Sequence, residues 1–453
     1  MNLKFVNRQQ ELKFLEDHAR KKSFEFIVIY GRRRVGKTSL LEEFLKNKEH
    51  VYFLCDKGGS LRNIERFKQL IATTWKQPLL ATTDWEELFK IPQLHNTIIV
   101  LDEFPYLVEK DHAIPSIFQV IIDTVLSKTS TMFIVSGSSM SMMERGVLSY
   151  ASPLYGRKTG HWKVQELSLH HMHKFVPTFT FEEVIEMSSV VGGIPFYARS
   201  MQHSSVRENI VVEIMNKTGR LYEETDFLLM EEFREPDVYK AVFQAMANGR
   251  TKSNDIANAS KIPVQDIDKY LKALITLRMI EKIRPIGIQT GKKTVYRIID
   301  PFLRFWFRFC EPFKSYLEKG DTSLAIELLD KEFNAFVGRH IEFVVREYLP
   351  IILPGNYTDI GTWWGKVRDG KEIEIDICAI GDRIILGESK WSSEVDGEKL
   401  AMQLYSKYQE SPWKEKRVEF LLIAKTFRTK VKKVNEIRVH CIDIKQLELA
   451  LKK

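Results

Sequence analysis

The first residues of this chain that could do chemistry form a glycine-rich loop. Its letters read G-x-x-x-x-G-K-T from Gly31 to Thr38, directly after the apolar run Phe26 to Tyr30. Backbone N–H groups in such a loop can surround phosphates, Lys37 can reach the outer phosphates, and the Thr38 hydroxyl can bind Mg²⁺. The pattern predicts a site for ATP and Mg²⁺. Its other predicted nucleotide contacts are Arg34, Val35, Gly36 and Ser39.

Two carboxylates follow a second apolar run, TIIVLDE, from Thr97 to Glu103. Four consecutive apolar residues are typical of a strand buried on both faces of a parallel sheet. Asp102 then lies at the carboxyl end of the strand, where ligands bind in open α/β sheets. There Asp102 can hold the Mg²⁺ shell, and Glu103 can orient or deprotonate the attacking water. The alternative is that Asp102 only caps the next segment.

A third cluster lies in the stretch EIDICAIGDRIILGESKW near the carboxyl end. A hairpin centred on Asp382 places Asp376 opposite Glu388 and Glu374 opposite Lys390, all on one face by period-two alternation. Like charges directly opposite each other are destabilising. A divalent cation would turn the repulsion between Asp376 and Glu388 into ligation, and Lys390 could then bind a phosphate or stabilise a metal-activated hydroxide. The alternative is the polar surface of an ordinary hairpin.

Composition limits what these clusters can belong to. The chain has 453 residues, 44% hydrophobic and 28% charged, which is typical of a globular protein of two to four domains. Its formal charge of +8 allows a polyanionic partner, although a lysine-rich solvated surface gives the same total. No run reaches the roughly 18 apolar residues of a membrane helix, and the first residues lack the apolar core of a signal peptide. With four widely spaced cysteines, these features predict a cytoplasmic protein with reduced thiols and no membrane partner.

The elements that position the clusters predict an α/β fold. Strand-like runs at 26–30, 51–54, 97–103 and 132–135 predict a P-loop NTPase parallel sheet with helices on both faces. We expect a winged helix next and a C-terminal α/β domain after it. The predicted domains are 1–165 (P-loop ATPase), 166–234 (helical lid), 235–300 (winged helix) and 301–453 (nuclease-like).

Several motifs resemble those of the STAND and AAA+-related P-loop ATPases, in particular the prokaryotic and archaeal ATPase family. FVNRQQEL (5–12) is similar to the F-x-x-R-x-x-E-L box of that group, and VGGIPFY (191–197) resembles its G-x-P motif, which carries Pro195. The resemblance implies that Ser136 or Ser138, after the run 132–135, senses the γ-phosphate. It also implies a charge-stabilising role for Arg157, whose alternative is an ordinary surface ion pair.

The winged helix is expected from three short helical patterns and a hairpin between residues 235 and 300. Asp266 and Asp268 occupy the start of its third helix, where a DNA phosphate groove would repel them. Cations of the wing could instead hold phosphates without reading sequence. These cations are Lys282, Arg284, Lys292 and Lys293. Signal relay by packing and direct DNA contact therefore both remain open for this domain.

Asp376 followed by Glu-x-Lys on the next strand resembles the PD-(D/E)xK restriction-endonuclease-like superfamily, with Ile375 in place of the usual proline. The resemblance implies a preceding helix that carries Glu342 as a further metal ligand. The leading hypothesis is thus an ATP-driven STAND-type switch coupled to a DNA-binding domain that can act as a nuclease. The alternative is a regulatory or signalling ATPase whose C-terminal domain is inactive and docks DNA or a regulatory protein. Oligomer formation is compatible with either hypothesis.

Overall fold

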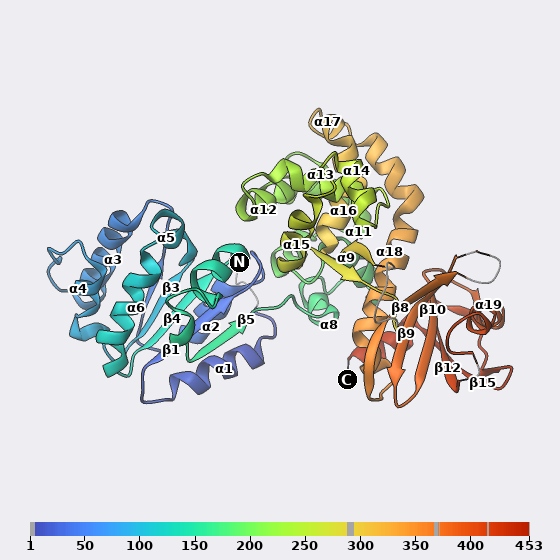
Figure 1. Ribbon diagram of the computed structural model, residues 1–453, viewed down its shortest axis with the longest axis horizontal. Coiled ribbons are helices and arrows are strands. Elements are labelled where there is room, and N and C mark those ends of the chain that lie inside the picture. The colour runs from blue at the N-terminus through green and yellow to red at the C-terminus, as the bar shows by residue number, and fades with distance from the viewer. Residues whose placement is uncertain (1–4, 288–293, 367–369, 371, 415, 453) are drawn as a thin grey trace. The chain divides into compact units, whose positions relative to one another are not determined.

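The computed structural model describes residues 5–287, 294–366, 370, 372–414 and 416–452 (Figure 1). The chain forms two compact units. The N-terminal unit comprises Met1–Leu167, Gly193–Tyr197 and Leu228–Arg234, and the C-terminal unit comprises Ser168–Gly192, Ala198–Phe227 and Glu235–Lys453. Two predicted wing cations, Lys292 and Lys293, lie outside the described residues. No helix of the described part is both long and apolar enough to cross a membrane.

The N-terminal unit is built on a five-stranded sheet with the order β2-β3-β4-β1-β5, in which every neighbouring pair is parallel. The strands are β1 (Glu25–Tyr30), β2 (His50–Leu54), β3 (Ile98–Asp102), β4 (Met132–Gly137) and β5 (Gly160–Lys163). All four predicted strands are present. Because β4 lies between β1 and β3, the residues that end these three strands meet at one edge of the sheet.

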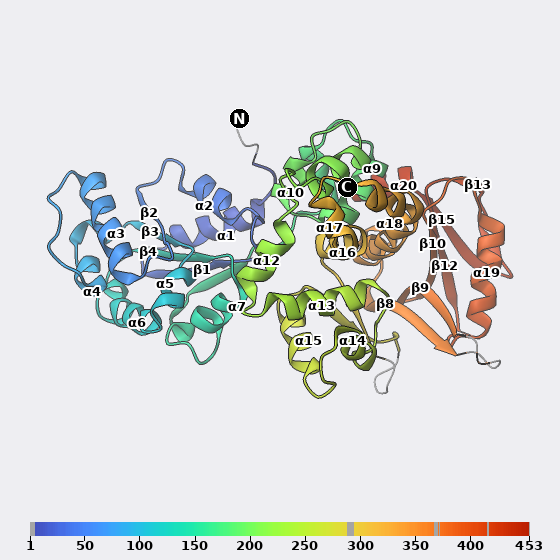
Figure 2. The same cartoon turned by 90° about the horizontal axis from the view of Figure 1, so that it is seen from above.

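Helices cover both faces of this sheet, as predicted (Figures 1 and 2). Phe26 and Phe133 pack into one aromatic core with α3 and α6, while Ile27 and Ile134 are buried on the opposite side. Successive residues of a strand point to opposite faces, and helices cover both faces, so every residue of these strands can be buried. This explains the continuous apolar runs in the sequence. The main helices are α1 (Gln9–Ala19), α2 (Lys37–Leu45), α3 (Ser60–Trp75) and α6 (Ile114–Thr124). Shorter helices are α4 (Trp85–Phe89), α5 (Pro105–Lys110) and α7 (Met140–Met143).

The C-terminal unit begins with the helices α8 (Leu169–Met172), α9 (Phe181–Val191), α10 (Pro195–Ser200, which starts in the other unit) and α11 (Val206–Asn209). A helix–hairpin segment follows: α13 (Pro236–Ala247), α14 (Ser253–Ser260), α15 (Ile267–Thr276), β6 (Ile280–Ile283) and β7 (Val295–Ile298). The order is that expected of three helices and a wing. Ile267, Leu271 and Leu274 are buried, so the helical spacing of α15 does mark its packed face.

The last part of the chain is a mixed sheet with the order β14-β15-β12-β10-β9-β8 (Figure 1). Its main strands are β8 (Tyr357–Lys366), β9 (Glu372–Gly381), β10 (Ile384–Lys390), β12 (Val418–Ala424) and β15 (Ile437–Asp443), with β14 (Lys433–Val434) at the edge. The helices that pack against it are α18 (Ser323–Ile352), α19 (Gly397–Gln409) and α20 (Ile444–Leu451), whereas α16 (Pro301–Phe309) packs against α9, α13 and α18. The sheet is antiparallel from β8 to β10 and parallel from β10 to β15.

The predicted hairpin register is confirmed where β9 and β10 pair, from Ile384 opposite Ile380 to Gly387 opposite Ile377. The predicted unbroken alternation of β9 is wrong. Against β8, the register shifts by one residue between Cys378 and Ile375, and both of these side chains enter the same core. A bulge of this kind leaves an extra residue in one strand and re-aims its neighbours. Asp376 lies inside this irregularity.

Candidate functional site

The phosphate loop owes its shape to backbone positions that side chains disfavour. Gly31 has φ 156° and approaches the backbone of Val164 so closely that a Cβ atom would lie 2.5 Å from its carbonyl oxygen. Gly36 has φ 99° and leads directly into α2, and Arg34 has φ 65°. Positive φ angles are accessible to glycine at little cost. The loop therefore ends at a helix N-terminus whose free N–H groups, including that of Ser39 in the first turn, form an anion site.

Lys37 is folded into this loop and is 5% exposed. Its Nζ donates to the carbonyl oxygens of Gly31, at 3.0 Å, and Arg32, at 3.1 Å. Burial lowers the pKa of Lys37, and the carboxylates of Glu103 and Asp102 oppose that shift. The ammonium group is thus close to both the loop backbone and the acids of β3, as a phosphate-binding lysine must be.

Thr38 in α2 and Asp102 at the end of β3 are 64 residues apart in the sequence, but their side chains are in contact. The Thr38 hydroxyl donates to Asp102 Oδ2 at 2.9 Å, and the Tyr52 hydroxyl donates to the same oxygen. Asp102 is 1% exposed, so its carboxylate is held in one orientation. A hydroxyl and a carboxylate oxygen at this separation are hard ligands suited to Mg²⁺. The predicted pair is therefore in place to hold the cation of a bound nucleotide.

Glu103 lies beside this pair in a left-handed backbone conformation, with φ 53°. Its carboxylate accepts hydrogen bonds from the Ser138 hydroxyl and, at 3.0 Å, from the Ser138 backbone N–H. Burial raises the pKa of Glu103, as suits a group that accepts a proton from water. Ser136, at the end of β4, is fully buried and its hydroxyl lacks a hydrogen-bond partner among the described residues. A γ-phosphate oxygen would satisfy that orphan hydroxyl.

Arg8, from the FVNRQQEL motif, anchors the loop from behind. It is 5% exposed, and its guanidinium donates to the Val35 carbonyl oxygen at 2.8 Å and pairs with Glu11 at 2.9 Å. The arginine immediately before α1 and the glutamate in its first turn therefore act together. Their contact explains the spacing of the motif, because Glu11 orients the side chain that holds the phosphate loop.

The G-x-P motif also packs beside the loop within the N-terminal unit. Arg34 lies over the ring of Phe196 at 4.2 Å, immediately after Pro195 at the start of α10. Gly193 donates its N–H to Glu166, which pairs with Arg32 at 3.3 Å. Arg32 and Arg34 of the phosphate loop thus contact residues that lie more than 130 positions later in the sequence. Pro195 is positioned beside the predicted nucleotide site.

Arg157 is engaged elsewhere. Its guanidinium forms a two-point ion pair with Asp123, at 2.8 and 2.7 Å, and donates to the Pro153 carbonyl oxygen at 2.7 Å. This is the surface ion pair that the sequence left open as an alternative. Within the described residues, Arg157 makes its hydrogen bonds and ion pair with these two residues and not with the phosphate loop.

Two acids that sequence reasoning missed complete this site. Glu231 pairs with Arg33 of the loop at 3.2 Å and accepts from Tyr106 at 3.3 Å. Glu232 accepts from the N–H groups of Met140, at 3.1 Å, and Ser141, at 3.3 Å. Both acids end α12 (Glu224–Glu232). No local motif marked them, because their role arises from a long-range contact of the chain.

The acidic cluster of the C-terminal unit lies where β9 and β10 separate. The pairing ladder ends at Ile377 and Gly387, one pair before Asp376 and Glu388. Asp376 Oδ2 instead accepts the backbone N–H of Ser389 at 3.2 Å. Glu388 is 3% exposed, and burial followed by the charge of Asp376 raises its pKa to about 7. The predicted neighbours are therefore brought close enough to repel.

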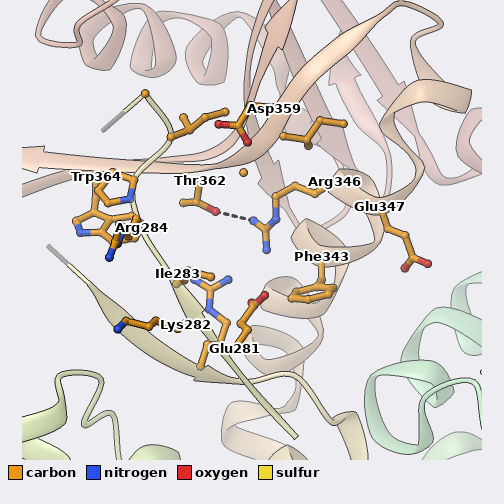
Figure 3. Close-up of a pocket in the computed structure, with 16 residues that line it drawn as sticks. Glu281, Lys282, Ile283, Arg284, Phe343, Arg346, Glu347, Asp359, Thr362 and Trp364 are labelled. Carbon is orange, nitrogen blue, oxygen red and sulfur yellow. Dashed lines mark hydrogen bonds between the residues drawn. The ribbon is translucent and has the colours of Figure 1, made fainter. Parts of the chain in front are cut away.

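Glu342 reaches the same cluster from α18. Burial, then Asp376, raises the pKa of Glu342 to about 8. Arg346, one turn later, donates to the Asp376 carbonyl oxygen at 2.8 Å. It also donates to the Thr362 hydroxyl at 2.9 Å (Figure 3). Arg346 therefore lies at the bulge of β9, where it binds the backbone carbonyl oxygen of Asp376. Glu342 and Asp376 are thereby held on neighbouring elements.

Two lysines lie near Glu388. Lys407 of α19, which was not predicted, forms a close ion pair with it. The predicted Lys390 is exposed at the end of β10, and its charge lowers the pKa of Glu388. Sequence reasoning missed Lys407 because it is 19 residues from Glu388 and no motif links them. In the described part of the chain, no three His, Cys, Asp or Glu side chains lie close enough together to hold a metal ion. Asp376 and Glu388 therefore offer at most a two-carboxylate site in this arrangement.

Comparison with known proteins places these sites in context. Residues 5–197 match the family described as an ATPase domain predominantly from Archaea, and residues 306–400 match archaeal and bacterial proteins of unknown function. An uncharacterized protein of Methanocaldococcus jannaschii is 37% identical over 414 residues, which are 89% of this chain and 91% of that protein. An uncharacterized ATP-binding protein of the same organism is 53% identical over 45 residues, 10% of this chain and 76% of that protein.

The chain is less similar in sequence to the proteins of solved structures. A Walker-type ATPase of Pyrococcus abyssi is 20% identical and matches 67% of this chain and 96% of its own, with a TM-score of 0.49. The ORC2 protein of Aeropyrum pernix is 14% identical and matches 73% of this chain and 95% of its own, with a TM-score of 0.45.

The long match to the M. jannaschii protein spans both units, and the match to the archaeal ATPase domain covers the phosphate loop, β3 and the G-x-P motif. The geometry of Lys37, Thr38 and Asp102 agrees with that domain. The chain belongs to the family of this M. jannaschii protein and is a P-loop ATPase, and its residues 5–197 match the ATPase domain found predominantly in Archaea.

Proposed function

We propose that the protein is an ATP-driven switch whose C-terminal unit binds nucleic acid and cleaves phosphodiester bonds with the help of a divalent cation. The observation that carries the second part is the cluster of Asp376, Glu388 and Glu342. Each pKa raised there reflects a carboxylate held near another negative charge in a buried place. A divalent cation would stabilise the ionised forms, because hard carboxylate oxygens are its preferred ligands.

The order of elements supports a restriction-endonuclease-like domain. A long helix with Glu342 precedes the hairpin of β9 and β10, and α19 and β12 follow, with β10 and β12 parallel. Asp376 and Glu388 would hold the cation, which would supply a water activated for attack on phosphorus. Lys407, already beside Glu388, would stabilise negative charge on the phosphate. Lys390, two residues after Glu388, remains the alternative lysine for that role.

The switch is supported by the path of the chain after α12. Glu231 and Glu232 bind the phosphate loop and the segment after β4, and the helix–hairpin segment begins only four residues later, at Pro236. Lys37 is close enough to both acids for their charges to act on it. A nucleotide phosphate would bring further negative charge to this place. We infer that ATP displaces these acids and so pulls on the chain that leads to the C-terminal unit.

A second candidate function is docking without cleavage. Two observations favour it: Lys407 already neutralises Glu388, and the described residues form no three-ligand metal group. In that case the C-terminal unit would recruit DNA or a regulatory protein under the control of the ATPase.

Plasmid nicking with Mg²⁺ or Mn²⁺, with and without ATP, tests the proposal. The wild type is compared with Asp376→Asn, Lys407→Ala, Lys390→Ala and the matched control Glu410→Gln, which changes an exposed acid of the same unit. We expect nicking by the wild type and by Glu410→Gln but not by Asp376→Asn. Loss in only one of the two lysine variants identifies the lysine that acts. Equal nicking by the wild type and Asp376→Asn would refute the cleavage site, and no nicking by any protein would favour docking.

A further inference from the structure

A cavity of about 520 Å³ opens beside the acidic cluster, within the C-terminal unit. It is lined by residues from the end of α13, from β7, α16 and α18, and from β9. Volumes of this size hold small-molecule ligands, because such pockets measure about 300–1,000 Å³. A single nucleotide or the end of one strand fits this range, whereas a duplex does not.

The lining of the cavity includes an arginine cluster, defined here as Arg297, Arg304 and Arg339. None of the three has a carboxylate at ion-pair distance among the described residues, while nearby Arg308 forms a two-point pair with Glu332. Arg297 and Arg339 repel the guanidinium of Arg304, and the nearby carboxylates of Asp300 and Glu342 have a smaller opposing effect. An anion in the cavity would remove that repulsion.

Arg304 shows the need for an anion most clearly. Burial, then the charges of Arg339 and Arg297, lowers its pKa to about 10. Its Nε is buried and has no hydrogen-bond partner among the described residues, and one terminal nitrogen is 3.2 Å from His340 Nδ1. The guanidinium is held in place over the ring of Phe336, at 4.9 Å. It is therefore a fixed donor with an unsatisfied N–H group.

The same lining carries the carboxylates of Glu342, Glu374 and Asp376, and Glu342 lies three residues after Arg339 on α18. A phosphate bound by the arginine cluster would therefore lie next to the acidic cluster. Phe343, half-buried in the lining, offers a ring on which a base can stack. A positive groove with an aromatic ring is the usual design of a site for single strands.

A second cavity, of about 660 Å³, continues from this place toward the wing (Figure 3). It shares Arg297 and Phe343 with the first cavity. Its lining adds the cations Lys282, Arg284 and Arg346 and the carboxylates Glu281, Glu347 and Asp359. The added cations could contact further phosphates of a strand that extends beyond one nucleotide.

We propose that the arginine cavity binds one nucleotide of a single-stranded nucleic acid, with a backbone phosphate on Arg297, Arg304 and Arg339 and a base against Phe343. Binding itself is independent of metal and of cleavage. The consequence that the next phosphodiester is presented to Asp376 rests on the function proposed above. The substrate class of the C-terminal unit is then single strands or frayed strand ends.

Fluorescence anisotropy of a labelled oligothymidylate tests this proposal on the full-length protein in EDTA, where metal-dependent cleavage is blocked. Because Arg339 is exposed, Arg339→Gln should fold, and it should weaken binding several-fold. Arg297→Gln with Arg339→Gln should reduce the slope of log affinity against log salt by about 1.4, since each lost phosphate contact on a single strand removes about 0.7. Phe343→Leu should weaken binding with an unchanged salt slope.

The matched control is Arg207→Gln, which removes an exposed arginine that pairs with Asp330 elsewhere in the unit. It should bind as the wild type does, and a blunt duplex should compete poorly. The proposal is overturned if Arg339→Gln and the double variant match Arg207→Gln, or if duplex and single strand compete equally. Arginine-dependent binding without nicking would refute cleavage but support this inference. Nicking that needs Asp376 but not the arginine cluster would refute this inference alone.

Discussion

Replacing Arg8 with alanine should weaken ATP binding even though Arg8 lies outside the glycine-rich loop. The side chain donates to the Val35 carbonyl oxygen at 2.8 Å and is held by Glu11 at 2.9 Å. Without it, the Val35 carbonyl oxygen loses this side-chain hydrogen bond, and the loop gains conformations that do not bind phosphate. Apparent affinity falls with the fraction of molecules whose loop is in the binding conformation.

The expected change in ATP affinity follows from the strength of the hydrogen bond between Arg8 and the Val35 carbonyl oxygen. A hydrogen bond with a charged donor contributes about 1.5–3 kcal/mol. Because Arg8 is 5% exposed, little of that value is lost to competition with water. If the whole contact maintains the binding conformation, the dissociation constant for ATP should rise by about 10- to 100-fold, since about 1.4 kcal/mol corresponds to tenfold.

Titration calorimetry with ATP and Mg²⁺ measures the effect directly. Lys13→Ala, which changes an exposed residue of the same helix, is the control and should bind as the wild type does. Arg8→Lys keeps the charge but loses the fork of donors, so we expect an intermediate constant. An Arg8→Ala protein with a wild-type melting temperature and a dissociation constant within twofold of the wild type would refute the reasoning.

Three further predictions concern the acids. Glu103→Gln should still bind ATP but should release phosphate about 10²- to 10⁴-fold more slowly, and unchanged turnover in a phosphate-release assay would exclude Glu103 as the base. The raised pKa of Glu342, to about 8, and of Glu388, to about 7, means that the folded unit holds protons that the unfolded chain releases. Their stabilising contribution is complete below a pH of about 4.3 and is lost as pH rises to about 8, so the melting temperature in EDTA should fall over that window and Glu342→Gln should flatten the curve. A wild-type curve that rises there, or an unchanged slope in the variant, would contradict this. Glu232→Gln should keep ATP hydrolysis but reduce the effect of ATP on oligonucleotide binding, and an undiminished effect would argue against its role in the switch.

Much of the nucleotide site could be predicted because its signals are local. The spacing from Gly31 to Thr38 specifies the loop and the first turn of the next helix, whatever the rest of the chain does. The contact between Thr38 and Asp102 required one more step, namely that parallel strands place their carboxyl ends at one edge. The roles of Glu231 and Glu232 had no such signal, because the chain returns to the loop only after a long helical excursion.

In the C-terminal site, too, local features could be predicted from the sequence and long-range contacts could not. The hairpin register followed from the turn and from period-two alternation, and it was correct up to Ile377. Alternation then failed at Asp376, because a bulge set by pairing with β8 shifted the strand by one residue. Lys407 and the arginine cluster come from helices packed on the sheet, so only the tertiary structure brings them to the acids. Sequence spacing within one hairpin carries no information about such neighbours.

The rate at which the protein cleaves a labelled single-stranded oligonucleotide with Mn²⁺, measured with and without ATP, tests the central claim most directly. If ATP at the phosphate loop controls the C-terminal unit, ATP should change the wild-type rate by about tenfold or more, the equivalent of about 1.4 kcal/mol of coupling. Lys37→Ala should cleave at one rate in both conditions, and Asp376→Asn should not cleave. A wild-type rate that is the same with and without ATP, or an ATP effect that survives in Lys37→Ala, would contradict the account.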